Sequence, residues 1–148
     1  QESTGSPVPV SGKIFISVNE NDKKQKTVDI VRKYVELGFG VIATYGTAKF
    51  LNVNGINAEP VFKVNEGRPN VVDRIKNGDI RVVLNTPLGY ESRFDEYAIG
   101  WAAVQNKIPF ITTLSAASSF AEGIAMIKKG KSRVKSLQEY YGDDHKKS

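Results

Sequence analysis

The feature that most constrains the fold of this chain is a regular alternation of short apolar runs with helical patterns. Five β-rich apolar runs occupy residues 13–18, 40–44, 58–64, 79–86 and 108–113. Helical patterns follow them at residues 27–38, 47–54, 69–78, 93–107 and 115–130. Strands that alternate with helices at this spacing form a parallel sheet with helices on both faces. The sequence therefore predicts an α/β fold, a three-layer α/β/α arrangement around a five-stranded parallel sheet.

The boundaries of the folded part follow from composition. Residues 1–11 are rich in Ser, Pro and Gly and are expected to be a linker that enters from an upstream domain. Residues 12–140 are expected to form one domain, and residues 141–148 a disordered charged tail. Pro60 in the third run predicts an edge strand, because proline cannot donate to a strand ladder.

Length, charge and cysteine content limit the possible functions. The chain has 148 residues, enough for one domain with a core, and contains no cysteine. The absence of cysteine excludes disulfide scaffolds, thiol catalysis and cysteine zinc sites, and it fits a cytoplasmic setting. No apolar run approaches the roughly 18 residues that a membrane span needs, and residues 1–11 do not resemble a signal peptide. We therefore expect a cytoplasmic protein with no membrane partner.

The formal net charge of +5 raises the question of nucleic-acid binding. Part of the positive charge lies in residues 127–135 and 145–148. The aromatic residues are scattered rather than interleaved with lysines, and no RNA- or DNA-binding motif is present. We expect a solvated basic surface or a basic pocket for a small anion, and no nucleic-acid partner.

Polar residues collect directly after the apolar runs, where α/β sheets bind their ligands. They are Ser17, Lys23 and Lys24 after the first run, Thr44, Gly46 and Thr47 after the second, Lys63 and Arg68 after the third, Asn85 and Thr86 in the fourth, and Thr112 in the fifth. Hydroxyls, cations and the free N–H groups of helix starts all bind oxyanions. The set predicts a site for a phosphorylated or acidic small molecule.

Several of these residues also have a purely structural interpretation. Thr47, and Ser115 or Ser118, are equally suited to act as helix N-caps. Lys23 and Lys24, taken singly, fit solvated charges at a helix entry. The agreement among five strand ends favours the binding interpretation over these alternatives.

A catalytic set is missing from the sequence. The single histidine, His145, lies in the tail, whereas acid–base catalysis usually needs a histidine or a perturbed carboxylate. Glu66, Asp73 and Asp79 are expected to be unpaired acids, and no acids show metal-ligand spacing. Residues 46–55 lack the Lys-Ser/Thr pair of a Walker A loop. We therefore expect a binding pocket without catalytic residues, metal or cofactor.

Four segments resemble one known family. "ISVNENDK", "GFGVIATYGTAKFLNVNGI", "VFKVNEGRPNVVDRIKNGDIRVVLNT" and "ITTLSAASSFAEGI" are similar to the C-terminal regulatory domain of the carbamoyl-phosphate synthase large subunit, a methylglyoxal-synthase-like domain. The resemblance covers residues 11–140, and "NEGRPN…DRIKNGDI" is its specific element. It implies the methylglyoxal-synthase-like fold and an allosteric function without catalysis in this domain.

In that family the domain binds uridine monophosphate (UMP) as an inhibitor and inosine monophosphate (IMP) as an activator, and ornithine acts from a neighbouring site. The resemblance implies effector contacts at Ser17, Lys23 or Lys24, Thr44, Thr47, Lys63 and Asn85, with Gly46, Arg68 and Thr86 beside them, and an ornithine-side contact at Thr112. The choice of effector stays open, because Pro87 replaces a hydroxyl residue that is common in bacterial members.

The resemblance also implies a parent enzyme and its partners. That enzyme is an ATP-dependent ligase that uses Mg²⁺ or Mn²⁺ and K⁺ and makes carbamoyl phosphate for pyrimidine and arginine biosynthesis. Its synthetase domains, its small glutaminase subunit and further copies of this domain would be the partners.

Two enzymes share the implied fold. Methylglyoxal synthase, the alternative function, has a catalytic aspartate after its third strand and a histidine after its fourth. Here Arg68 stands near the place of the acid, and no histidine follows the fourth run. Inosine-monophosphate cyclohydrolase has a Lys-Thr-Leu-His-Pro-Lys segment, which is absent. Residue chemistry therefore favours effector binding over either activity.

Overall fold

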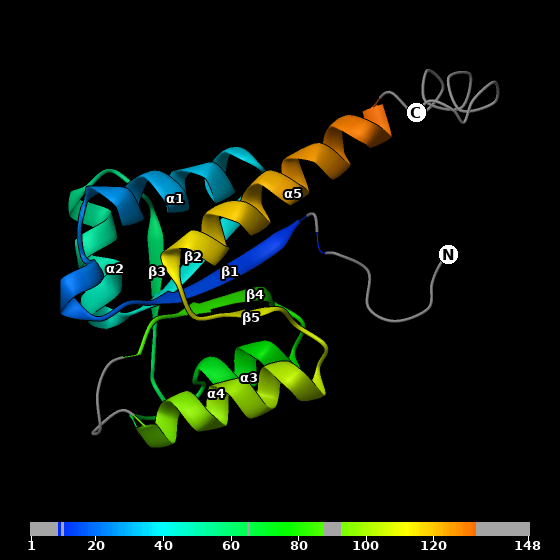
Figure 1. Cartoon of the computed structure of the whole chain (residues 1–148). Coiled ribbons are helices and arrows are strands. Elements are labelled where there is room, and N and C mark those ends of the chain that lie inside the picture. Colours follow the sequence, from blue (N-terminus) through cyan, green and yellow to red (C-terminus); the bar gives the residue numbers. More distant parts are fainter. Residues whose placement is uncertain (1–8, 10, 65, 88–92, 133–148) are drawn as a thin grey trace.

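The structure is a computed structural model that describes residues 9, 11–64, 66–87 and 93–132. Its centre is a parallel sheet with strand order β3-β2-β1-β4-β5 (Figure 1). The strands are β1 (Gly12–Ser17), β2 (Phe39–Thr44), β3 (Ala58–Val61), β4 (Ile80–Asn85) and β5 (Phe110–Ile111). The helices are η1 (Glu20–Asp22), α1 (Gln25–Glu36), α2 (Tyr45–Val53), α3 (Val71–Lys76), α4 (Arg93–Gln105) and α5 (Leu114–Ser132).

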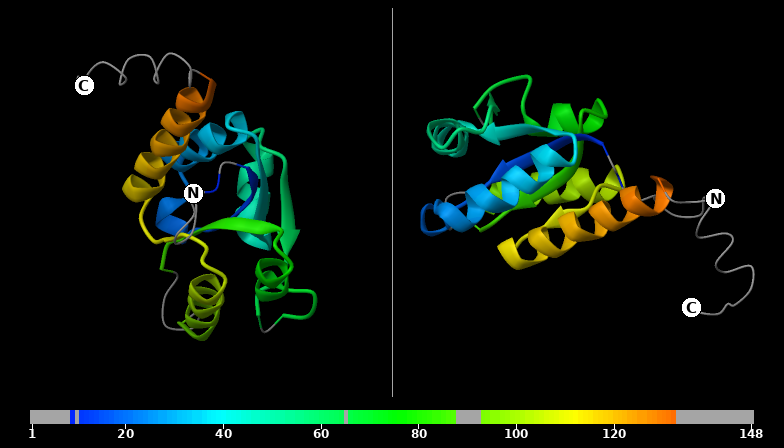
Figure 2. Two further views of the ribbon diagram at one scale, coloured as in Figure 1. Left: turned by 90° about the vertical axis from the view of Figure 1, so that its right-hand side faces the viewer. Right: turned by 90° about the horizontal axis from the view of Figure 1, so that it is seen from above.

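Helices cover both faces of the sheet, which confirms the predicted three-layer α/β/α fold (Figures 1 and 2). Successive strand side chains point to opposite faces, so each central strand serves two cores. Ile14 and Ile16 of β1 pack on the side of α1, α2 and α5. Phe15, between them, packs with Val71 of α3 and Ile99 of α4. The strands therefore read as continuous apolar runs.

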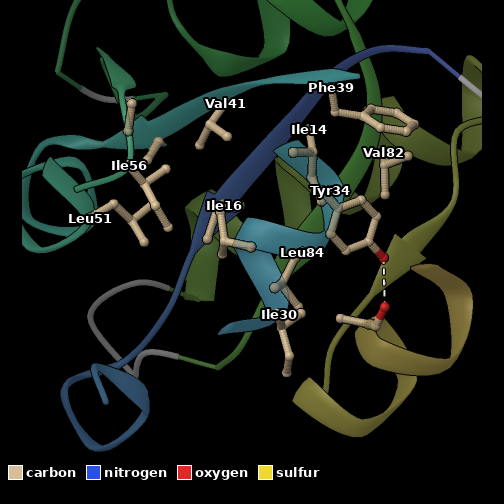
Figure 3. Packing of buried hydrophobic residues seen from close by; sticks show 14 of the residues in the cluster. Ile14, Ile16, Ile30, Tyr34, Phe39, Val41, Leu51, Ile56, Val82 and Leu84 are labelled. Atoms are coloured by element: carbon tan, nitrogen blue, oxygen red, sulfur yellow. Dashed lines mark hydrogen bonds between the residues drawn. The ribbon is translucent and has the colours of Figure 1, made fainter. Parts of the chain in front are cut away.

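A buried tyrosine links two helices of the first core. Tyr34 of α1 is fully buried, and its hydroxyl donates a hydrogen bond of 2.7 Å to the carbonyl oxygen of Ala117 in α5 (Figure 3). The Tyr34 ring meets Phe39 edge-on, with ring centroids 5.7 Å apart. Burial raises the pKa of the Tyr34 hydroxyl, which therefore stays a donor. This contact holds α1 and α5 together behind the sheet.

Several boundaries differ from those expected. β5 contains only two residues, because it pairs with β4 only at Phe110 and Ile111 before the chain turns into α5. β3 is the edge strand that Pro60 predicts. Most of the predicted linker and the whole of the predicted tail lie outside the described residues.

The alternative interpretation of Thr47, and of Ser115 or Ser118, as helix N-caps is wrong. α2 begins at Tyr45, so its N-cap is Thr44 rather than Thr47. At α5, Thr113 Oγ1 accepts a hydrogen bond of 3.1 Å from the N–H of Ala116, in the place expected for Ser115 or Ser118. Ser118 instead accepts a hydrogen bond from Lys33 Nζ. Thr47 is therefore available for a function other than capping.

Within the described residues, no helix has the length and apolar content that a membrane crossing requires. The same residues contain no group of three or more His, Cys, Asp or Glu placed to hold a metal ion.

Candidate anion-binding site

A hollow of about 340 Å³ lies beyond the carboxyl ends of β1 and β2, beside the end of β3. We call it the β1–β2 hollow. It is lined by Ser17, Val18, Asn19, Glu20, Lys23, Thr44, Tyr45, Gly46, Thr47, Lys63 and Glu66. Six of the ten residues predicted to contact an effector are among them, namely Ser17, Lys23, Thr44, Gly46, Thr47 and Lys63. Because β1, β2 and β3 are neighbours in the sheet, these six predicted residues lie together although Ser17 and Lys63 are 46 positions apart in the sequence.

Three hydroxyl groups meet in this hollow. Thr44 Oγ1 lies 3.2 Å from Thr47 Oγ1 and 3.5 Å from Ser17 Oγ. All three residues are at most 5% exposed. Thr47 Oγ1 also accepts a hydrogen bond of 3.3 Å from the N–H of Val18, which fixes the loop after β1 over α2.

The three hydroxyl groups have more hydrogens than there are hydrogen bonds between them. Three hydroxyls carry three hydrogens, but only two contacts join them, and Val18 is itself a donor. At least one hydroxyl hydrogen therefore has no protein acceptor in the described part of the chain. Such a hydrogen is free to be donated to an oxygen atom that occupies the hollow. An anion in the hollow would supply the missing acceptor.

The start of α2 provides further donors. The first N–H groups of a helix have no partner within the helix, and the Thr44 side chain does not cap them. The first turn of α2 contains no acidic residue, so the positive end of its dipole is not neutralised locally. Gly46 has no side chain to cover this turn. A helix start of this kind favours an anion.

Lys23 is held over this helix start by the short helix η1. A Cβ atom placed on Gly46 would lie only 3.2 Å from Lys23 Nζ, so the ammonium group sits close above the first turn of α2. Its one ion-pair partner in the described chain is Glu20, whose side chain is 86% exposed, at an Nζ–Oε2 distance of 2.5 Å. Because the Glu20 side chain is so exposed, a bound anion could replace this carboxylate at low cost.

Asn19 and Thr86 position the loop that carries Lys23. The Asn19 side chain caps η1 by accepting a hydrogen bond of 2.9 Å from the N–H of Asp22. The Asn19 N–H donates to Thr86 Oγ1 at 2.9 Å, and the Thr86 N–H donates to the carbonyl of Ser17. Thr86 is buried and does not line the hollow. Its contacts tie the loop to the end of β4.

Lys63 and Glu66 close the hollow on the β3 side. The backbone N–H of Lys63 donates a hydrogen bond of 2.8 Å to Glu66 Oε1, which folds the loop after β3 toward the hollow. Lys63 forms no ion pair with any residue that the structure describes. It therefore supplies a second cation, on the side of the hollow opposite β1.

The remaining predicted residues lie elsewhere. Lys24 is the N-cap residue of α1 and does not line the hollow, so the geometry favours Lys23 over Lys24. Asn85 is buried beside Ser17 in the sheet register. Thr112 is exposed beyond β5, at the sheet edge opposite β3. Arg68 borders a different hollow.

This second hollow, of about 380 Å³, lies between α3 and α4, and we call it the α3–α4 hollow. Arg68 lines it and forms a two-point ion pair with Asp73, with Nη2–Oδ1 at 2.7 Å and Nε–Oδ2 at 3.2 Å. Asp73 also accepts a hydrogen bond of 2.8 Å from the N–H of Asn70. The Asn70 N–H, and after it Arg68, hold the pKa of Asp73 below its usual value.

The expectation of unpaired acids is therefore wrong for Asp73 and Asp79, whereas Glu66 forms no ion pair with a described residue. Asp79 pairs with Arg74 at 2.8 Å, in addition to the contacts of Glu66 and Asp73 described above. Asp73 is the third residue of α3, from which a carboxylate reaches back to the N-cap N–H. The spacing of Asn70 and Asp73 was the signal for this capping box.

Sequence reasoning did not place Glu20 or Tyr45 at the site. Tyr45 is 55% exposed, lines the β1–β2 hollow, and stacks its ring on Phe62 with centroids 5.9 Å apart. The available signal was an aromatic residue between the two threonines Thr44 and Thr47.

Comparison with known proteins gives a consistent family. The model of the family described as MGS-like domain matches residues 26–112. A carbamoyl phosphate synthase large chain of Acidobacterium capsulatum is 49% identical over 138 residues, which cover 93% of this chain and 12% of that protein. The carbamoyl phosphate synthase large chain of Archaeoglobus fulgidus is 42% identical over 139 residues. The aligned stretch covers 94% of this chain and 13% of that protein.

One relative is itself a section of a large chain. The carbamoyl phosphate synthase large chain, C-terminal section, of Aquifex aeolicus is 47% identical over 146 residues, 95% of this chain and 27% of that protein. The chain thus spans between about an eighth and about a quarter of the length of these relatives. Among solved structures, the crystal structure of ForH covers 80% of both chains at 13% identity with a TM-score of 0.46, a weak likeness.

Proposed function

This chain belongs to the MGS-like domain family, and from that premise we propose that it is the allosteric effector-binding domain of a carbamoyl phosphate synthase large chain. Support comes from relatives of that name, which match 93–95% of this chain over only a fraction of their own length. The remaining length would hold the synthetase domains, which use ATP, Mg²⁺ or Mn²⁺, and K⁺ together with a small glutaminase subunit. Carbamoyl phosphate synthesis would take place outside this domain.

The observation that supports effector binding most strongly is the convergence of donors on the β1–β2 hollow. An uncapped helix start, a surplus buried hydroxyl hydrogen and the ammonium groups of Lys23 and Lys63 share one space. The volume of about 340 Å³ lies within the roughly 300–1,000 Å³ of small-molecule pockets. Charge-assisted hydrogen bonds contribute about 1.5–3 kcal/mol each, so several of them support micromolar affinity, about −8 kcal/mol. The ligand is a nucleoside monophosphate, UMP or IMP, with its phosphate at the start of α2.

Regulation requires that the effector bind two states of the whole enzyme unequally, with a coupling typically of about 1–3 kcal/mol. The loop of Asn19 offers a route for this coupling, because it touches the hollow and is also bonded to Thr86 at the end of β4. On the ornithine side, the proposed contact is Thr112, which is exposed at the far edge of the sheet.

A phosphate-eliminating lyase of the methylglyoxal synthase type is the weaker alternative. Two carboxylates, Glu20 and Glu66, line the β1–β2 hollow, but Glu20 is paired with Lys23 and Glu66 with a backbone N–H. The chain's only histidine is His145, outside the described residues. We expect no phosphate release from dihydroxyacetone phosphate. Turnover by the purified chain, abolished in a Glu66→Gln variant, would instead establish the lyase.

We further propose that α4 mediates self-association. Tyr97, Trp101 and Val104 recur at helical spacing and are each at least 57% exposed. Exposed apolar stripes commonly mark interfaces. Sedimentation of the chain should show a concentration-dependent oligomer that Trp101→Ser weakens. A monomer at all concentrations would contradict this interface.

Isothermal titration calorimetry tests effector binding directly. UMP or IMP should bind the chain with micromolar affinity, and Lys63→Ala should weaken that binding. Absence of heat with both nucleotides up to millimolar concentrations would contradict the function. Unchanged affinity in Lys63→Ala would contradict the role of Lys63 alone.

A further inference from the structure

The β1–β2 hollow contains an aromatic surface that phosphate binding does not use. Tyr45 is the first residue of α2 and lies between Thr44 and Gly46, so its ring is adjacent to the helix start that would hold the phosphate. The ring stacks on Phe62 with an interplanar angle of 23°, and the residue is nevertheless 55% exposed. One face of the Tyr45 ring is therefore supported by protein while much of the side chain remains accessible.

The supporting ring is held from a second direction. Gly67, with φ of +151°, lies so close to Phe62 that an added Cβ would be 3.2 Å from the ring atoms Cδ2 and Cε2. Phe62 also forms a bridge to Asn70 through its backbone. Phe62 is thus confined between the loop at Gly67 and the ring of Tyr45. Because the rings of Tyr45 and Phe62 are already ordered, little conformational entropy is lost when a third ring stacks on them.

We infer that Tyr45, backed by Phe62, stacks against a planar ring of the ligand whose phosphate binds at the start of α2. This inference rests on the proposed function and names the residue that would recognise the base of the nucleotide, a group that a sugar phosphate and inorganic phosphate lack. Glu66 lines the same hollow, and its Oε2 has no donor among the described residues. That oxygen can accept from a hydroxyl of the sugar that joins phosphate to base.

Three ligands separate the phosphate site from the platform. Calorimetry of the chain with UMP, ribose 5-phosphate and inorganic phosphate should show UMP binding about 5- to 100-fold more tightly than ribose 5-phosphate, the range expected for one stacked base. Tyr45→Ala should lower UMP affinity to the level of ribose 5-phosphate and leave ribose 5-phosphate unchanged. Tyr45→Phe should keep the preference, because it keeps the ring. Met126→Ala, which removes an exposed side chain of α5 outside the hollow and outside the proposed α4 interface, should change neither affinity.

The outcomes distinguish failure of the platform from failure of the site. Equal affinities for UMP and ribose 5-phosphate in the natural chain would overturn the platform while leaving the phosphate site intact. Equal weakening of both ligands in Tyr45→Ala would show a structural role for Tyr45 and overturn the platform, as would a loss of preference in Tyr45→Phe. No binding of any of the three ligands would overturn the proposed function and the platform together.

Discussion

The β1–β2 hollow and the α3–α4 hollow are similar in volume, about 340 and 380 Å³, and each contains residues at the start of a helix and at least one cation. They differ in whether their polar groups are already satisfied. At α3, Asn70 Oδ1 accepts from the N–H groups of Val72 and Asp73, Asp73 accepts from the Asn70 N–H, and Arg68 pairs with Asp73. This arrangement stabilises a helix and leaves little for a ligand.

At α2 the corresponding groups are left open. The N-cap residue Thr44 makes no capping hydrogen bond, and its hydroxyl joins those of Ser17 and Thr47. Glu20, an acid that lines the same hollow, is almost fully exposed and pairs with a lysine rather than with the helix. The difference teaches that a basic residue beside a helix start does not by itself indicate an anion site. The informative sign is a helix start whose donors the chain does not satisfy.

The largest expected difference between the two hollows is in nucleotide affinity after removal of a cation. Lys23→Ala should weaken UMP or IMP binding about 10- to 100-fold, since one charge-assisted hydrogen bond is lost. Calorimetry measures this effect. Lys24→Ala, its neighbour outside the hollow, and Arg68→Ala should each leave the affinity almost unchanged. A larger loss of nucleotide affinity in either control variant than in Lys23→Ala would show that the anion binds outside the β1–β2 hollow.

The next effect concerns stability at the capped helix. Asn70→Ala should lower the free energy of unfolding by about 1 kcal/mol, the usual cost of a lost N-cap, with nucleotide affinity unchanged. Urea unfolding followed by circular dichroism gives the value. Asn70→Ser retains an acceptor for the α3 N–H groups and should recover most of the loss. A marked loss of nucleotide affinity in Asn70→Ala would remove the distinction between the two hollows.

Gly46→Ala should separate stability from binding at the uncapped helix. Alanine favours a helix by about 0.5–1 kcal/mol over glycine, and the added methyl meets only the flexible end of Lys23. Thermal stability should therefore rise slightly while nucleotide affinity falls several-fold, because the methyl displaces the ammonium group. Melting curves and titrations of the same sample test both parts. An unchanged affinity would show that Lys23 does not need its place above Gly46.

The smallest effect is the contribution of Asp73, in the α3–α4 hollow, to the pH dependence of stability. The pKa of Asp73 is lowered by the Asn70 N–H and by Arg68, so its ionised form stabilises the fold above its unfolded pKa of about 4. This stabilisation is lost as the pH falls through the lower folded pKa. Asp73→Asn should flatten the acid side of the curve of unfolding free energy against pH. If the unfolding free energy of Asp73→Asn fell with decreasing pH just as it does in the natural chain, Asp73 would not contribute to the acid dependence of stability.

The fold was predictable because its signals are local. Apolar runs such as Val82–Leu84 and the helical spacing of Val28, Val31 and Val35 appear directly in the sequence. The site was predictable only in part. Ser17, Thr44 and Lys63 share a hollow because β1, β2 and β3 are neighbours in the sheet, an order that no local pattern reveals.

The errors have the same origin. Arg68 follows β3 in the sequence, but the loop carries it to α3, on the opposite face of the sheet from α2, where Asp73 neutralises it. Tyr45 was overlooked because its partner Phe62 lies 17 positions away. Contacts between segments decided both cases.

The most direct test of the central claim is the backbone amide spectrum of the ¹⁵N-labelled chain during titration with UMP and with IMP. We predict saturable shifts at Tyr45, Gly46 and Thr47 and in the loop of Asn19, with the amides of Val71, Val72 and Asp73 unmoved. Shifts centred on the start of α3, or no saturable shift at the start of α2 with either nucleotide, would contradict it.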